Sequence, residues 1–100
     1  MKMSTALPAL FVGHGNPMNA VRNNAYTSAW RGIGERLTMP RAILAISAHW
    51  YVPATGVTMN AAPRTIHDFR GFSKELFQVQ YPAPGDPELA RRVQRMLAPL

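Results

Sequence analysis

The sequence contains no cysteine, which excludes disulfide bonds and thiolate metal sites. It also lacks any apolar run that approaches the roughly 20 residues of a membrane-spanning helix. Met1, Lys2 and Met3 are followed by only a short apolar run, which is too brief for a secretory signal. We therefore expect a cytoplasmic protein without a membrane partner.

Acidic residues are also scarce. Five Asp and Glu residues stand against eleven Lys and Arg residues, and the formal net charge is +6. Such an excess can indicate nucleic-acid binding. The basic residues are scattered, however, and only Arg91, Arg92 and Arg95 cluster. Because no basic stretch is interleaved with aromatic residues, we expect no nucleic-acid partner.

Two short apolar runs predict buried strands. Leu7–Val12 is stopped by Gly13-His14-Gly15-Asn16-Pro17, and Ala42–Ser47 is followed by Ala48-His49-Trp50. An uninterrupted apolar run that ends at turn residues is typical of a strand buried on both faces of a parallel sheet. Residues 57–60 alternate apolar and polar side chains, which predicts a third, shorter strand.

Three segments carry helix signals. Ala25–Leu37 has apolar residues at helical spacing, although two internal glycines weaken the pattern. Ser73–Phe77 predicts a short helical turn. Asp86 is typical of an N-cap and Pro87 of a first helical position, for an amphipathic helix that runs to Leu97.

Strand, helix and strand in this order predict a βαβ unit with a right-handed crossover. The fold class that we predict is α/β, a three-layer sandwich with a mainly parallel or mixed central sheet. This chain would supply the first βαβ unit and the flanking elements. The pattern breaks off at Leu100, where another strand is expected, so we expect a truncated chain.

Both main strands are followed by a histidine. His14 lies two residues after Val12, and His49 lies two residues after Ser47. The carboxyl ends of neighbouring parallel strands meet at one edge of the sheet, where open α/β sheets bind ligands. The two imidazoles could therefore share a metal, although iron, zinc, copper and nickel all accept this ligand. The alternative is that each is an ordinary polar turn residue.

Other readings of these segments are weaker. Gly13-His14-Gly15 lacks the third glycine and the lysine of a phosphate loop. Ser47 is close to His49, but no G-x-S-x-G elbow of a hydrolase is present. We favour His67 as a loop residue of a substrate pocket over a third ligand or a base paired with Asp68. Four aromatic residues could wall an aromatic substrate or simply pack in the core: Trp50, Tyr51, Phe69 and Phe72.

Four stretches together carry a family pattern. They are ALFVGHGNPM at Ala9–Met18, ISAHW at Ile46–Trp50, TIHDF with GF at Thr65–Phe72, and YPAPG at Tyr81–Gly85. In this order they resemble the 4,5-DOPA dioxygenase group of the class III extradiol dioxygenases. The resemblance covers nearly the whole chain.

The resemblance implies that His14 and His49 bind a metal, whereas His67 is no metal ligand in the family pattern. The remaining ligand and the acid–base histidine are expected beyond residue 100, so the catalytic residues stay unknown. Residues 1–100 would form the N-terminal portion of a single catalytic domain. We expect this fragment alone to be inactive.

The activity implied is that of a metal-dependent extradiol dioxygenase, which opens the ring of a catechol-type aromatic with O2. The cofactor implied is one divalent metal, Fe(II) or Zn(II), of which only iron is redox-active. The partners implied are a catechol and O2, and homo-oligomer formation stays open. The alternatives are a non-oxygenase member of the same fold that binds a ligand or partner, and a zinc-dependent hydrolase.

Overall fold

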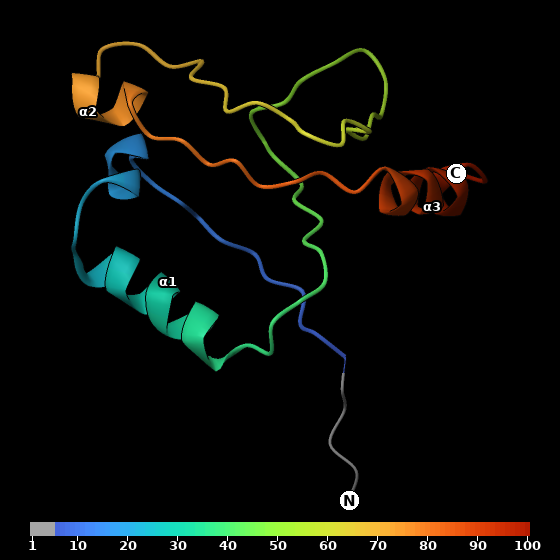
Figure 1. Cartoon of the computed structure of the whole chain (residues 1–100), viewed down its shortest axis with the longest axis horizontal. Coiled ribbons are helices and arrows are strands. Elements are labelled where there is room, and N and C mark those ends of the chain that lie inside the picture. The colour runs from blue at the N-terminus through green and yellow to red at the C-terminus, as the bar shows by residue number, and fades with distance from the viewer. Residues whose placement is uncertain (1–5) are drawn as a thin grey trace, which may run out of the picture. The chain divides into compact units, whose positions relative to one another are not determined.

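The structure is a computed structural model that describes residues 6–100. Residues 1–5, on which the expectation about a secretory signal partly rests, lie outside the described part. The elements in chain order are the 3-10 helix η1 (Pro17–Ala20) and the helices α1 (Ala25–Arg36), α2 (Lys74–Phe77) and α3 (Pro87–Leu97) (Figure 1). None of the helices between residues 6 and 100 has both the length and the apolar character needed to cross a bilayer.

The chain divides into two compact units. Over the described residues, the first consists of residues 6–41 and His67–Val79, and the second consists of Ala42–Ile66 and Gln80–Leu100. Each unit is therefore built from two segments that are distant in the sequence.

The predicted strands are not formed in the described part of the chain. Residues 7–12, 42–47 and 57–60 follow irregular paths, and large apolar side chains such as Phe11 and Ile46 stand exposed. A strand is stable only when neighbouring strands pair with its backbone and another layer covers its apolar face. Residues 7–12 and 42–47 belong to different units, and neither has a strand partner within its own unit. Over the described residues, the expected βαβ unit and the α/β sandwich are therefore not confirmed.

Helix α1 confirms the helix predicted at Ala25–Leu37, and it ends one residue earlier, at Arg36. Its N-cap is Asn24, whose Oδ1 accepts hydrogen bonds from the backbone N–H groups of Tyr26 at 2.9 Å and Thr27 at 3.0 Å. Thr27 Oγ1 accepts in return from the backbone N–H of Asn24 at 2.9 Å. This capping box satisfies donors that the first helical turn leaves open, and it offsets part of the cost of the two internal glycines.

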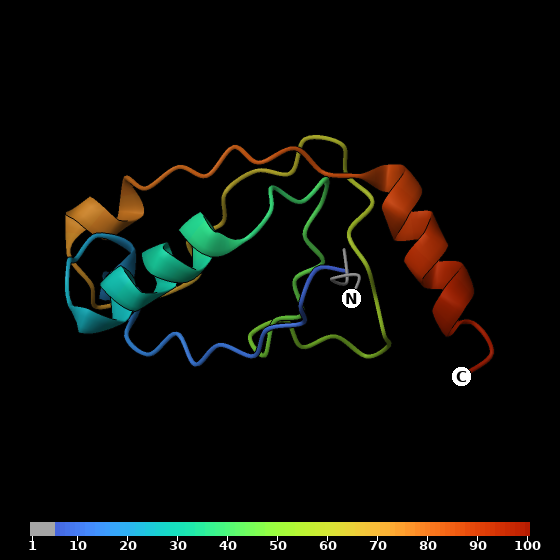
Figure 2. The ribbon, with the colours of Figure 1, turned by 90° about the horizontal axis from the view of Figure 1, so that it is seen from below.

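A small core forms where α2 packs on η1 in the first unit. Leu76 of α2 is 3% exposed and Met18 of η1 is 8% exposed. Ser73, the N-cap of α2, donates from Oγ to Met18 Sδ at 3.7 Å. Figures 1 and 2 both show α2 beside η1. The predicted helical turn at Ser73–Phe77 is confirmed, and it gives the first unit its apolar centre.

Helix α3 confirms the predicted amphipathic helix of the second unit. Asp86 Oδ1 accepts a hydrogen bond from the backbone N–H of Leu89 at 3.0 Å, and Pro87 takes the first helical position. Ala90 is buried, at 4% exposed, whereas Leu97 is still 43% exposed. The apolar side of α3 is therefore only partly covered by the described residues.

Residues 61–65 and 81–85 run antiparallel in the second unit. The backbone N–H of Gly85 donates to Ala61 O at 2.9 Å, and that of Tyr81 donates to Thr65 Oγ1 at 2.9 Å. Residues 82 and 84 are prolines without an N–H, so this pair of segments cannot form a regular ladder. A Cβ at position 85 would overlap the backbone oxygen of Asn60, so the close approach requires glycine.

Candidate functional site

His14 lies in an exposed loop that leads into η1. The following Gly15 has a φ of 63°, in the left-handed region that glycine adopts readily. His14 Nδ1 lies 2.9 Å from the backbone oxygen of Gly15. Because a carbonyl oxygen can only accept, Nδ1 must be the nitrogen that carries the proton. A neutral ring in this tautomer has its lone pair on Nε2, which is the atom that a metal would take.

Three asparagine side chains hold the loop around His14. Asn16 Oδ1 accepts from the backbone N–H of Met18 at 2.8 Å and so caps η1. Asn19 Nδ2 donates to His14 O at 3.0 Å, and Asn24 Nδ2 donates to Asn19 Oδ1 at 2.7 Å. The loop is thus tied to η1 and, through Asn24, to the start of α1. Sequence reasoning missed Asn19 and Asn24; the one signal was the capping-box spacing from Asn24 to Thr27.

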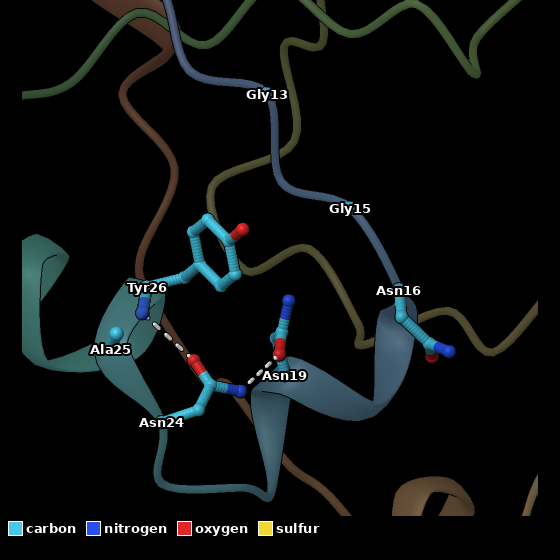
Figure 3. Close-up of a pocket in the computed structure, with 7 residues that line it drawn as sticks. All are labelled: Gly13, Gly15, Asn16, Asn19, Asn24, Ala25 and Tyr26. Carbon is cyan, nitrogen blue, oxygen red and sulfur yellow. Dashed lines mark hydrogen bonds between the residues drawn. The ribbon is translucent and has the colours of Figure 1, made fainter.

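An open hollow of about 640 Å³ lies beside this loop in the first unit. It is lined by Gly13, Gly15, Asn16, Asn19, Asn24, Ala25 and Tyr26. Figure 3 shows the two glycines on one side of the hollow and the ring of Tyr26 on another, with the amide of Asn19 between them. Amide groups beside a phenol ring and small apolar residues suit a small ligand that has both an apolar body and polar substituents.

His49 lies in an exposed turn of the second unit. Its backbone N–H donates to Ser47 Oγ at 3.1 Å, so the serine stabilises the turn locally. Because His14 belongs to the first unit, a metal site shared by the two histidines stays a prediction. Within residues 6–100, no group of three or more His, Cys, Asp or Glu side chains is arranged to hold a metal ion.

His67 lies half-buried in an aromatic cluster of the first unit. Its Nε2 is 2.8 Å from Val79 O, so this nitrogen donates and the lone pair of the neutral ring lies on Nδ1. The ring centroid is 6.1 Å from that of Phe69 and 6.3 Å from that of Phe77. Phe69 also packs on Phe72 with centroids 5.6 Å apart. These contacts give His67 a structural role, and its place in a substrate pocket stays a prediction.

The aromatic residues proposed to wall a substrate fall into both units. Phe69 and Phe72 belong to the cluster around His67, in the first unit. Trp50 and Tyr51 lie in the second unit, where Tyr51 is 98% exposed. The ring of Trp50 lies over Gly56, at 3.4 Å from where a Cβ would stand. The packing alternative is therefore confirmed for Phe69 and Phe72 only, because Trp50 and Tyr51 are exposed.

Known proteins resemble this chain over nearly its full length. Residues 6–98 match the family described as "Catalytic LigB subunit of aromatic ring-opening dioxygenase". The chain is 52% identical over 97 residues to the 4,5-DOPA dioxygenase extradiol of Escherichia coli (strain K12), and the match covers 97% of the chain and 36% of that relative. It is 43% identical over 94 residues to the 4,5-DOPA dioxygenase extradiol of Beta vulgaris, with 88% and 34% covered. No solved structure matches the chain.

The chain spans about a third of the length of these relatives, 36% and 34%. The resemblance carried by the four sequence motifs is confirmed by the match, which includes all four of them. The chain therefore belongs to the LigB family of aromatic ring-opening extradiol dioxygenases.

Proposed function

We propose that this chain is the N-terminal part of a metal-dependent extradiol dioxygenase. Such an enzyme uses O2 to open the ring of a catechol beside its two hydroxyl groups. The observation that carries the proposal is the family match over residues 6–98, because that range contains both the His14 motif and the His49 motif. The relatives are 4,5-DOPA dioxygenases, so DOPA is the first catechol to test. The chain spans 36% of the Escherichia coli relative, and we assign the remaining metal ligand and the acid–base residue to the rest of the family domain.

His14 and His49 are the proposed metal ligands, and the donor chemistry of His14 fits that role. Its Nδ1 donates to Gly15 O, which is a common arrangement in imidazoles that bind a metal through Nε2. A Cβ at Gly13, the residue before His14, would meet no atom of a non-neighbouring residue within 4 Å. When bound, Fe(II) supplies Lewis acidity and redox capacity, whereas Zn(II) supplies Lewis acidity alone.

His67 is the proposed substrate-pocket residue. Since its Nε2–H is engaged with Val79 O, contact with a catechol would involve Nδ1, which can accept a hydrogen bond from a substrate hydroxyl. The contacts with Phe69 and Phe77 hold the ring in a fixed orientation. His67 would thus orient the substrate without binding the metal.

A hybrid protein tests the proposal. In it, this chain replaces the corresponding first third of the Escherichia coli relative. The hybrid is loaded with Fe(II) without air and then given oxygen and DOPA; it should consume one O2 per ring and form a yellow conjugated semialdehyde. The Zn(II) form should bind the catechol without turnover. Equal turnover with both metals would exclude redox chemistry, and no oxygen uptake despite bound Fe(II) would favour the ligand-binding or hydrolase alternative.

A further inference from the structure

We infer that Asn19 and Asn24 are positioning residues for His14. Asn24 caps α1 with one atom of its amide and holds Asn19 with the other. Asn19 in turn holds the backbone of His14. The start of α1 thereby fixes the loop that carries the proposed metal ligand. The role of His14 as a metal ligand rests on the proposed function, whereas the hydrogen bonds among Asn24, Asn19 and His14 do not depend on it.

The orientation of both amides follows from their partners. Asn24 Oδ1 accepts from the N–H groups of Tyr26 and Thr27, and an N–H can only donate, so Nδ2 of Asn24 must face Asn19. Asn19 then receives this bond at Oδ1, at 2.7 Å, which turns its own Nδ2 toward His14 O at 3.0 Å. Flipping either amide would place two donors or two acceptors against each other. We call this series of bonds from Asn24 through Asn19 to His14 O the asparagine relay.

The asparagine relay has a firm anchor at one end and a flexible segment at the other. Thr27, which completes the capping box with Asn24, is only 8% exposed. Gly15, at the far end, has the conformational freedom of glycine and sits at a φ of 63°. Without the bond from Asn19, the peptide between His14 and Gly15 would lose a restraint that ties it to η1. A rotation of this peptide would carry the Gly15 carbonyl oxygen away from Nδ1 and so remove the bond that sets the tautomer.

Fixing this tautomer matters for a metal ligand. The hydrogen bond made by one ring nitrogen decides which nitrogen offers its lone pair to the metal. Removing the group that hydrogen-bonds to the other ring nitrogen of a ligating histidine typically lowers metal affinity by roughly 10- to 100-fold. The asparagine relay acts more indirectly: it holds the His14–Gly15 peptide, and the carbonyl group that accepts the Nδ1–H bond belongs to the next peptide along the chain.

The variant Asn24→Asp should break the asparagine relay and leave the N-cap of α1 in place. The aspartate retains the oxygen that caps α1 and is itself a favourable N-cap residue. It cannot donate to Asn19, so the relay is broken at its anchored end. Asn19→Ala removes the bonds to Asn24 and His14 directly. The matched control is Asn23→Asp, because Asn23 Oδ1 accepts from the Arg31 guanidinium at 3.4 Å and takes no part in the relay.

Nitrogen-15 NMR of the full 100-residue chain, at a pH well above the ordinary imidazole titration range, reports the tautomer of His14. The wild type and Asn23→Asp should show the proton on Nδ1. Asn24→Asp and Asn19→Ala should move it largely to Nε2, while the amide signals of α1 persist in Asn24→Asp. An unchanged tautomer in either variant, the absence of the Nδ1–H form in the wild type, or loss of α1 in Asn24→Asp would overturn the inference.

A metal titration distinguishes failure of this inference from failure of the proposed function. In the hybrid protein, Asn24→Asp should weaken Zn(II) binding by roughly 10- to 100-fold relative to Asn23→Asp. His14→Ala should abolish the site. If His14→Ala binds zinc as the wild type does, the proposed ligand is wrong, and the tautomer experiment alone decides the relay. If His14→Ala loses the metal and Asn24→Asp does not, the positioning role is overturned.

Discussion

Asn19 Nδ2 donates a hydrogen bond of 3.0 Å to the backbone oxygen of His14, five residues earlier in the chain. This bond connects the loop of the candidate metal ligand to η1, the element that contains Asn19. Asn19 in turn accepts from Asn24, the N-cap of α1. The geometry of the His14 motif therefore depends on residues that lie outside the motif, and substitutions there should affect it.

Gly15→Ala should disturb the His14 loop, whereas Gly13→Ala should be tolerated. At a φ of 63°, a residue with a Cβ costs about 1–2 kcal/mol, and the new Cβ would stand at an ordinary 3.5 Å from Asn19 Nδ2. Gly13 has no positive φ, and a Cβ there would meet nothing within 4 Å. Zinc titration of the hybrid should show about tenfold weaker binding for Gly15→Ala only. Equal losses in both variants would contradict the described loop.

Met18→Ala should destabilise the first unit far more than Met39→Ala. Met18 is 8% exposed against α2, whereas Met39 is 88% exposed. Truncating a buried methionine typically costs about 2 kcal/mol or more, and an exposed one costs less than about 0.5 kcal/mol. Denaturant unfolding of the two hybrid variants measures the difference. Similar midpoints for both would show that the contact between η1 and α2 contributes nothing to stability.

His67→Phe should retain the bound metal and lower stability modestly. A phenyl ring preserves packing against Phe69 and Phe77 but removes the donor to Val79 O, which costs about 1 kcal/mol. The KM for DOPA should rise, because the acceptor at Nδ1 is also lost. Unfolding curves, metal analysis and steady-state kinetics of the hybrid separate these effects. Loss of metal from this variant would make His67 a ligand and would contradict its proposed role in the substrate pocket.

The 100-residue chain alone should self-associate. Apolar side chains of the predicted strand segments are exposed, Phe11 at 103% and Ile46 at 93%, and such surfaces associate in water. Light scattering after size exclusion should show species larger than a monomer. Phe11→Ser with Ile46→Ser should reduce association, while Met39→Ser, which changes an exposed side chain outside these segments, should not. A wild-type chain that stays monomeric at all concentrations would contradict the prediction.

The helices could be predicted because their signals are local. Asp86 and Pro87 mark the start of α3 within two adjacent residues, and the structure begins the helix there. Capping side chains and i, i+4 spacing act over one or two turns, so the sequence suffices. The strands at residues 7–12 and 42–47 depend on pairing with distant segments, and no such pairing occurs within either unit over the described residues. An apolar run shows that a segment needs burial but does not show what will cover it.

The candidate site was predictable only in part, for a similar reason. The residue types around His14 and their order were visible in the motif. The tautomer of His14 and the asparagine relay depend on the φ of Gly15 and on the directions of two amides, which no spacing rule gives. Likewise, the bond from His67 to Val79 O joins residues that are twelve positions apart through a turn of the chain.

The proposed function depends above all on His14 and His49 being ligands of one metal ion. The metal-to-protein ratio of the hybrid, measured by elemental analysis in His14→Ala, His49→Ala and His67→Ala, tests this pairing without relying on turnover. We expect the ratio to fall sharply in the first two variants and to be unchanged in the third. Full metal occupancy in either His14→Ala or His49→Ala would show that the substituted residue is no ligand and that the proposed metal site is wrong.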